Sequence, residues 1–121
     1  MHYVDPTTLV VFDNGNVRRA QSDDADSRGQ VLTLNEQTRD ADLILNADLG
    51  NYSVALGSAQ KLPNGNYVFT SGFQQPNPPN TFGQSIEVLP DGTTTYVLQI
   101  SGVEYRSYRM ANLYGGNGGV V

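Results

Sequence analysis

The feature that most restricts how this chain can fold is an internal repeat of roughly 55 residues, close to the length of known propeller repeats. The stretch LVVFDNG at 9–15 matches NYVFTSG at 66–72, so that Leu9 corresponds to Asn66. Further along, GQVLTLNEQT at 29–38 matches GQSIEVLPDG at 83–92, so that Gly29 corresponds to Gly83. The two matches differ slightly in spacing, because the loop between the matched stretches differs in length. A repeat of this kind that holds four short strands is typical of a β-propeller blade.

Alternating apolar and polar residues, interrupted by turn-forming residues, predict the strands themselves. The turns PNGN at 63–66 and PDGT at 90–93 contain the Asn-Gly and Asp-Gly pairs that favour tight hairpins. A shortened first strand is expected at His2–Val4, and no helix longer than a turn or two is expected. The polar loops 16–28 and 73–82 are predicted to lack regular structure. Eight further strands are predicted, at Thr8–Asp13, Gln30–Leu34, Asp42–Asn46, Val54–Leu62, Asn66–Ser71, Ser85–Leu89, Thr94–Ile100 and Glu104–Leu113.

These strands predict an all-β fold with about two four-stranded antiparallel propeller blades and a lone C-terminal strand. The chain is read as a single partial propeller domain, with one blade over about 2–48 and a second over about 52–101. A closing strand at 103–113 and a glycine-rich tail at 115–121 follow. Two blades cannot close a ring of roughly four to eight, and an isolated pair exposes two apolar faces. A single β-sandwich or a small open barrel is the alternative.

Composition excludes several classes of function. The chain has 121 residues, a net charge of −5 and a pI of about 4.5, which argues against binding nucleic acid or an anionic membrane surface. It has no cysteine, so neither a disulfide nor a thiolate metal site is possible. No apolar run approaches the length of a membrane span, and the start MHYVDPTT is unlike a signal peptide.

Several stretches in the expected order carry a family resemblance: TTLVVFDNGN, SRGQVLTLNEQT, YSVALGSAQKLPNGNYVFTSG, GQSIEVLPDGT and EYRSYRM. Over residues 5–114 they resemble the C-terminal part of arylsulfotransferase-family β-propellers. The resemblance implies a six-bladed ring, often secreted or periplasmic, while the compartment of this chain stays undetermined. It also implies sulfuryl transfer between phenols through a histidine, without a diffusible nucleotide donor. No cofactor is expected.

Two residues are candidates for that chemistry, which needs a nucleophilic nitrogen and groups that hold the sulfuryl oxygens. Counting back from Pro6, the histidine of the Gln-His-Asp motif that the resemblance implies would fall at or just before the first residue here. His2 falls about two residues later and is more easily explained as an exposed terminal side chain. Arg28, in SRGQ, stands where the resemblance places an anion-holding arginine, and a guanidinium suits sulfate oxygens. A surface salt bridge from Arg28 to the acidic loop of Asp23, Asp24 and Asp26 is the alternative.

Other patterns are assigned simpler roles. The stretch DNGN at 13–16 lacks the acidic spacing of a calcium loop, so no metal site is predicted. Five tyrosines are interpreted as packing between blades, because their rings bury a large area: Tyr52, Tyr67, Tyr96, Tyr105 and Tyr108.

The C-terminal strand predicts self-association, because it offers an unpaired backbone edge. Homo-oligomers are expected through open blade faces and edge strands, and three copies would supply six blades. In such a ring the last strand would lie beside Thr8–Asp13 of the next copy, a place that His2–Val4 already partly occupies. The residues assigned to self-association are Glu104, Tyr105, Arg106, Ser107, Tyr108, Arg109 and Met110.

The functional prediction is an arylsulfotransferase-like propeller segment that is not catalytic alone, because the sulfuryl-carrying histidine is not identifiable. If the chain is active at all, it would move a sulfuryl group from an aryl sulfate to a phenol. The alternatives are a structural or ligand-binding β module that self-assembles, and a truncated fragment without independent function.

Overall fold

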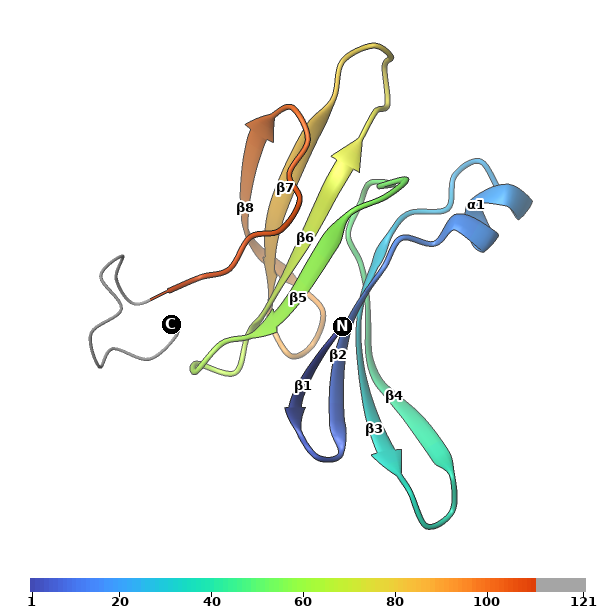
Figure 1. The fold of residues 1–121 in the computed structure, drawn as a ribbon, viewed down its shortest axis with the longest axis vertical. Helices are drawn as coiled ribbons and strands as arrows, with labels where there is room; N and C mark the ends of the chain where they lie inside the picture. Colours follow the sequence, from blue (N-terminus) through green and yellow to red (C-terminus); the bar gives the residue numbers. More distant parts are fainter. Residues whose placement is uncertain (111–121) are drawn as a thin grey trace.

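The computed structural model describes residues 1–110, which form two four-stranded antiparallel sheets and one short helix (Figure 1). The first sheet has the order β1-β2-β3-β4, and the second has the order β5-β6-β7-β8. This confirms the prediction of an all-β fold with two four-stranded units. The elements are β1 (His2–Asp5), β2 (Thr8–Asp13), α1 (Asn16–Gln21), β3 (Arg28–Asn35), β4 (Asp40–Asp48), β5 (Gly57–Lys61), β6 (Tyr67–Gln74), β7 (Phe82–Val88) and β8 (Thr94–Ser101).

Every strand within a sheet pairs with its neighbour in the sequence, so the turns set the topology. Gly65 and Gly92, in the two predicted hairpin turns, both have a φ of 91°, a conformation that glycine adopts without strain. The strand predicted at Val54–Leu62 begins later, at Gly57, because Leu56 has a positive φ of 65° that interrupts an extended backbone.

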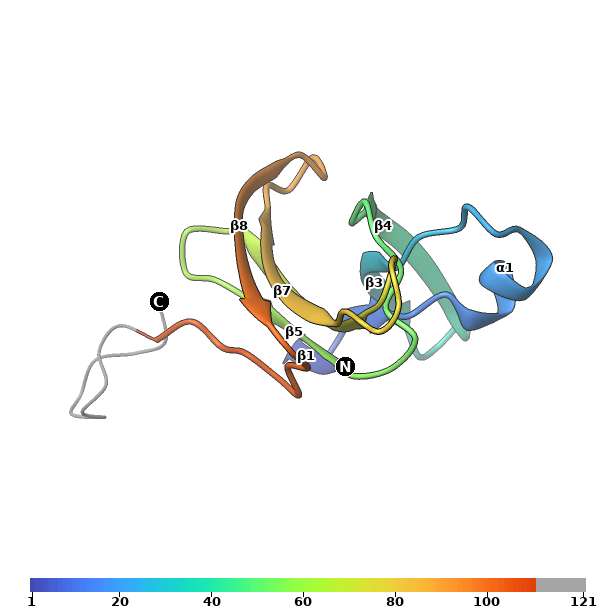
Figure 2. The same ribbon diagram turned by 90° about the horizontal axis from the view of Figure 1, so that it is seen from above.

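The core lies between the two sheets, which face one another (Figure 2). Val10 and Val31 pair across β2 and β3, so both project from one face, and both are fully buried. From the second sheet, Phe69 and Ile86 pair across β6 and β7 and are equally inaccessible to water. Of the tyrosines predicted to pack between blades, Tyr67 joins this core, whereas Tyr96, Tyr105 and Tyr108 are exposed and Tyr52 is half-buried.

Two phenylalanine rings lock the sheets together in a reciprocal way. A Cβ atom placed on Gly29 of β3 would lie 2.3 Å from the ring of Phe69. A Cβ atom placed on Gly57 of β5 would lie 2.2 Å from the ring of Phe12 on β2. Each sheet therefore inserts a ring into a position where the other sheet has no side chain.

These contacts correct half of the repeat alignment. The first sequence match aligns Phe12 with Phe69, yet Phe12 faces the second sheet and Phe69 faces the first. In a propeller, corresponding residues of successive blades face the same way around the ring, and side chains alternate along a strand, so an alignment of two strands that is wrong by one residue matches side chains on opposite faces. The match of Gly29 with Gly83 aligns residues that face the same way. Gly29 faces the second sheet, and Gly83 faces Glu104, in the part of the chain that follows the second sheet. The match of Phe12 with Phe69 does not, because the two side chains face in opposite directions around the ring, so the alignment of β2 with β6 must move by one residue.

The prediction that loop 16–28 lacks regular structure is wrong, because Asn16–Gln21 form α1. Gly15 precedes the helix with a φ of 81°, and the carboxylate of Asp13 accepts a hydrogen bond from the Gly15 amide at 2.8 Å. The same carboxylate accepts a hydrogen bond from the side chain of Arg18, in the first turn of the helix. The Asp13 carboxylate thus stabilises a helix that has no buried residue of its own.

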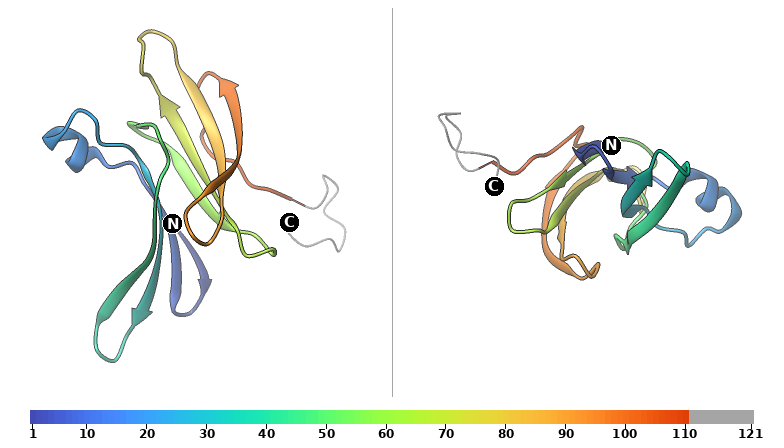
Figure 3. Two further views of the ribbon diagram at one scale, coloured as in Figure 1. Left: turned by 180° about the vertical axis from the view of Figure 1, so that it is seen from behind. Right: turned by 90° about the horizontal axis from the view of Figure 1, so that it is seen from below.

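The strand predicted at Glu104–Leu113 is also not found over its described part, and residues 111–113 lie outside the described residues. Residues 103–110, the C-terminal segment, cross the second sheet on the side away from the first sheet (Figure 3). Its backbone bonds mainly to side chains of the sheet, since Ser107 O accepts from Ser58 Oγ and Arg109 N–H donates to Gln60 Oε1. Polar side chains on this face of the sheet therefore take the place of the neighbouring backbone with which a strand would pair.

Within residues 1–110, no helix is long and apolar enough to cross a membrane.

Candidate functional site

Arg28 is the first residue of β3 and lies in a row of three charged residues. Its register partners are Asp13 on β2 and Asp48 on β4, so the three side chains leave the same face of the first sheet. This outer face is opposite the one that holds Val31. Among residues 1–110, no ion pair of Arg28 is found, neither with this row nor with the acidic loop before it.

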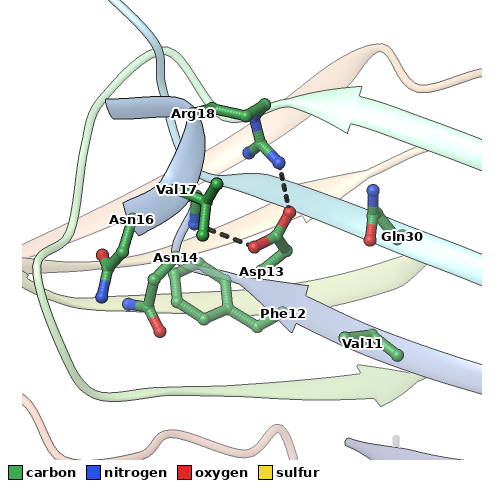
Figure 4. A pocket seen from close by; sticks show the side chains of 9 residues that line it. Val11, Phe12, Asp13, Asn14, Asn16, Val17, Arg18 and Gln30 are labelled. Carbon is green, nitrogen blue, oxygen red and sulfur yellow. Dashed lines mark hydrogen bonds and ion pairs between the residues drawn. The ribbon is translucent and has the colours of Figure 1, made fainter. Parts of the chain in front are cut away.

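The same outer face carries a cavity of about 550 Å³ next to α1 (Figure 4). Asp13, Arg18 and Gln30 are among its lining residues, and Arg18 Nη1 lies 2.5 Å from Asp13 Oδ2. The Arg18 Nε atom is buried and has no hydrogen-bond partner. Arg18 was not among the predicted site residues, although an arginine pair one residue after DNGN was a signal for it.

The charges around Arg28 nearly balance. Arg18 is paired with Asp13, and a second carboxylate, Asp48, stands on the other side of Arg28. An anion that approached Arg28 would therefore meet two carboxylates as well as two guanidinium groups. This row on its own holds an anion less well than an isolated arginine cluster would.

His2 is not brought near Arg28. It lies exposed on the edge strand β1 and pairs with Val10, whereas Arg28 pairs with Asp13, further along β2. With strands about 4.8 Å apart and about 3.3 Å per residue, their Cα atoms are separated by about 14 Å. Because Val10 and Asp13 project from opposite faces of β2, the two side chains also leave the sheet on opposite sides.

The comparisons with known proteins agree with the fold. The model of the family described as Arylsulfotransferase (ASST) matches residues 2–109, nearly the whole described chain. The chain belongs to the arylsulfotransferase family. The comparisons with curated proteins and with solved structures gave no match.

The C-terminal segment is the other polar centre of this arylsulfotransferase-family chain. Glu87 of β7 is buried and forms an ion pair with Arg109, whose guanidinium also lies 5.2 Å from the centre of the Tyr96 ring. A hydrogen bond from Asn66, followed by the positive charge of Arg109, holds the pKa of Glu87 below its ordinary value. The segment is thus attached through a charged pair that is intact at neutral pH.

The residues predicted for self-association divide into two groups on this segment. Glu104, Ser107 and Arg109 face the sheet, where the Ser107 hydroxyl lies 2.7 Å from that of Thr70. The exposed group is Tyr105, Arg106, Tyr108 and Met110. Within residues 1–110, no group of three or more His, Cys, Asp or Glu side chains could hold a metal ion.

Proposed function

We propose that this chain supplies two blades of an arylsulfotransferase-type propeller and does not transfer a sulfuryl group by itself. The observation that carries the proposal is the position of His2, the single histidine of the sequence. It is exposed on an edge strand, about 14 Å from Arg28 by strand spacing, and leaves the opposite face of the sheet.

Sulfuryl transfer through a histidine requires its nitrogen to reach the sulfur while donors hold the sulfuryl oxygens. Reacting atoms must approach to about 3–3.5 Å before such a step can occur. His2 and Arg28 cannot meet at one sulfuryl group from opposite faces of a sheet. Family membership supports the blade role, and this separation supports the absence of turnover in the chain alone.

The test is an assay with an aryl sulfate donor and a phenol acceptor, with release of the donor phenol as the readout. We expect no turnover above that of the double variant His2→Ala/Arg28→Ala. Turnover that falls about tenfold or more in each single variant would contradict the proposal, since a loss of about 1.4 kcal/mol of transition-state stabilisation would assign both residues to the reaction.

A second candidate function is favoured by the apolar side chains left exposed on both outer surfaces. Leu43 and Ile44 of β4 are exposed on the first sheet, and Tyr96 and Leu98 of β8 on the second. We propose that a second copy of the chain covers these surfaces, so that the chain acts as a self-assembling β module. The packing of the second sheet on the first inside one chain offers the geometry for the same contact between chains.

The pairing of β1 with β2 changes how such copies would meet. Because β1 occupies the edge of β2, the last segment of another copy could lie there only by displacing β1. We therefore favour contact through sheet faces and the exposed side of the C-terminal segment. Light scattering should give a mass above 13.1 kDa that falls for Tyr108→Asp, with the exposed Val17→Asp on α1 as a matched control. A wild-type monomer at high micromolar concentration would contradict this second proposal.

A further inference from the structure

The face of the second sheet that lies away from the first sheet carries two rows of polar side chains. Ser58, Thr70 and Ser85 are register partners across β5, β6 and β7 and form one row. Gln60 and Glu87 lie two residues further along β5 and β7, in the next row on the same face. All of them except Ser85 are buried, although no other sheet covers them. Buried groups of this kind need hydrogen-bond partners, and the C-terminal segment supplies them.

Part of this face binds the backbone of the segment, as a neighbouring strand would. Gln60 Oε1 accepts from the Arg109 N–H at 2.8 Å, and Gln60 Nε2 donates to Arg109 O at 3.0 Å. Ser58 Oγ donates to Ser107 O at 3.0 Å, and Thr70 Oγ1 accepts from the Ser107 N–H at 3.1 Å. Because every residue has these backbone groups, the bonds hold an extended segment without selecting its sequence.

Two side chains of the segment supply the selection. The Ser107 hydroxyl lies 2.7 Å from that of Thr70, in the first row. Two residues later, Arg109 forms an ion pair with Glu87 in the second row, and its guanidinium lies 5.2 Å from the centre of the Tyr96 ring. Residues two apart in an extended chain point to the same side, so the spacing of the segment matches that of the rows. The face therefore fits the pattern Ser-x-Arg.

The connection between the second sheet and the segment is open. The pattern Ser-x-Arg occurs once in the sequence, at 107–109, so each copy of the chain has one such segment and one such face. Gly102 joins them with a φ of 87°, and no atom lies within 4 Å of the place where its Cβ would be. Glu104 N–H donates to Gly72 O at 2.9 Å, and over residues 105–110 no further hydrogen bond joins the backbone of the segment to that of the sheet. Moving residues 105–110 to another copy would thus break no backbone pairing and would form the same contacts again.

We propose that the polar face of the second sheet accepts the C-terminal segment of a second copy in exchange for its own. Ser107 and Arg109 of one copy then complete the face of the other. The segment of the same chain competes, because a short tether gives it an effective concentration of about 1 mM or more. Exchange is therefore favoured by a high protein concentration or by weaker binding within one chain. This contact uses the side of the segment that faces the sheet, so it does not depend on the contacts between copies proposed above.

The test uses reversal of one charge in each of two chains. Arg109→Glu sets two carboxylates against each other within one chain, and Glu87→Arg sets two guanidinium groups against each other. In a mixture, the face of the Arg109→Glu chain can receive the unchanged segment of the Glu87→Arg chain.

NMR of the ¹⁵N-labelled Arg109→Glu chain gives the readout. Its amide signals at Ser58, Gln60 and Thr70 should differ from those of the wild type, because its own segment no longer binds. Addition of the unlabelled Glu87→Arg chain should return them, saturably, toward their wild-type positions. Signals that already match the wild type before mixing, or that do not move on mixing, would overturn the proposal.

The double variant Glu87→Arg/Arg109→Glu is the matched control. It has the same substituted face as the unlabelled partner, but its segment carries a carboxylate. It should therefore bind the labelled face about tenfold more weakly or worse. Equal binding by both unlabelled chains would contradict the role of Arg109.

A synthetic peptide of residues 103–110 repeats the test without a substitution in the sheet, with its Arg109→Glu form as the control. Failure of the unaltered peptide to shift the same amides of the Arg109→Glu chain would also overturn the proposal. Because the readout is occupancy of this face and not mass, such a failure would leave the light-scattering result for Tyr108→Asp to be judged separately.

Discussion

The reciprocal contact between Gly29 and Phe69 allows the packing of the two sheets to be tested with a single methyl group. In Gly29→Ala the new Cβ would lie 2.3, 2.4 and 2.6 Å from three ring atoms of Phe69. Carbon atoms in contact are normally about 3.5–4.0 Å apart, so the ring or β3 must move by about 1 Å. Gly29 does not have a positive φ, so the effect is steric rather than conformational.

Phe69 is fully buried and has little room to move. Overpacking of this kind costs about 1–3 kcal/mol, which for a domain of this size lowers Tm by roughly 4–12 °C. Urea and thermal unfolding followed by circular dichroism measure both quantities.

A double-mutant cycle separates this clash from a general sensitivity of β3 to substitution. Phe69→Leu removes ring atoms where the alanine methyl group would go, so Gly29→Ala should cost less than about 0.5 kcal/mol in that background. The reasoning is refuted if Gly29→Ala costs the same with phenylalanine and with leucine at position 69.

Two further predictions concern the charged contacts. The pKa of Glu87 in the folded chain lies below the ordinary value of 4.5, so its contribution to stability is complete above about pH 4.5 and is lost as the pH falls through the folded pKa. Urea unfolding between neutral and acid pH should therefore show a steeper loss for the wild type than for Glu87→Gln, and parallel curves would contradict this. Arg18→Gln removes the ion pair that anchors α1 to Asp13, so the amides of Arg19 and Ser22 should exchange with solvent faster while those of β6 do not change. Equal exchange at α1 in both proteins would show that the ion pair does not hold the helix.

The sheets could be predicted from the sequence because their information is local. Alternation gives the strands, and glycines such as Gly65 and Gly92 permit the left-handed turns between them. The pairing of neighbours then follows without any knowledge of distant contacts. It was harder to predict which face of each strand a side chain leaves, because Phe12 and Phe69 match in the sequence but face opposite directions.

The rest depended on partners that are far away in the sequence. The C-terminal segment has the alternation of a strand, but Ser58, Gln60 and Thr70 of the second sheet bind its backbone instead. The helix in loop 16–28 depends on the carboxylate of Asp13, and polar composition alone does not reveal that contact. For the candidate site, a sequence can suggest Arg28 but cannot show that Asp13 and Asp48 flank it.

The interlocked rings and glycines also bear on the order of events in folding. Each strand pairs with its sequence neighbour, so each sheet can form from short loops, which close quickly. Phe12 and Phe69 reach their glycines only when both sheets are largely formed, which makes docking of one sheet on the other a late and concerted step. Substitutions at Gly29 and Gly57 should therefore accelerate unfolding far more than they slow refolding, and the paired sheets should persist or disappear together.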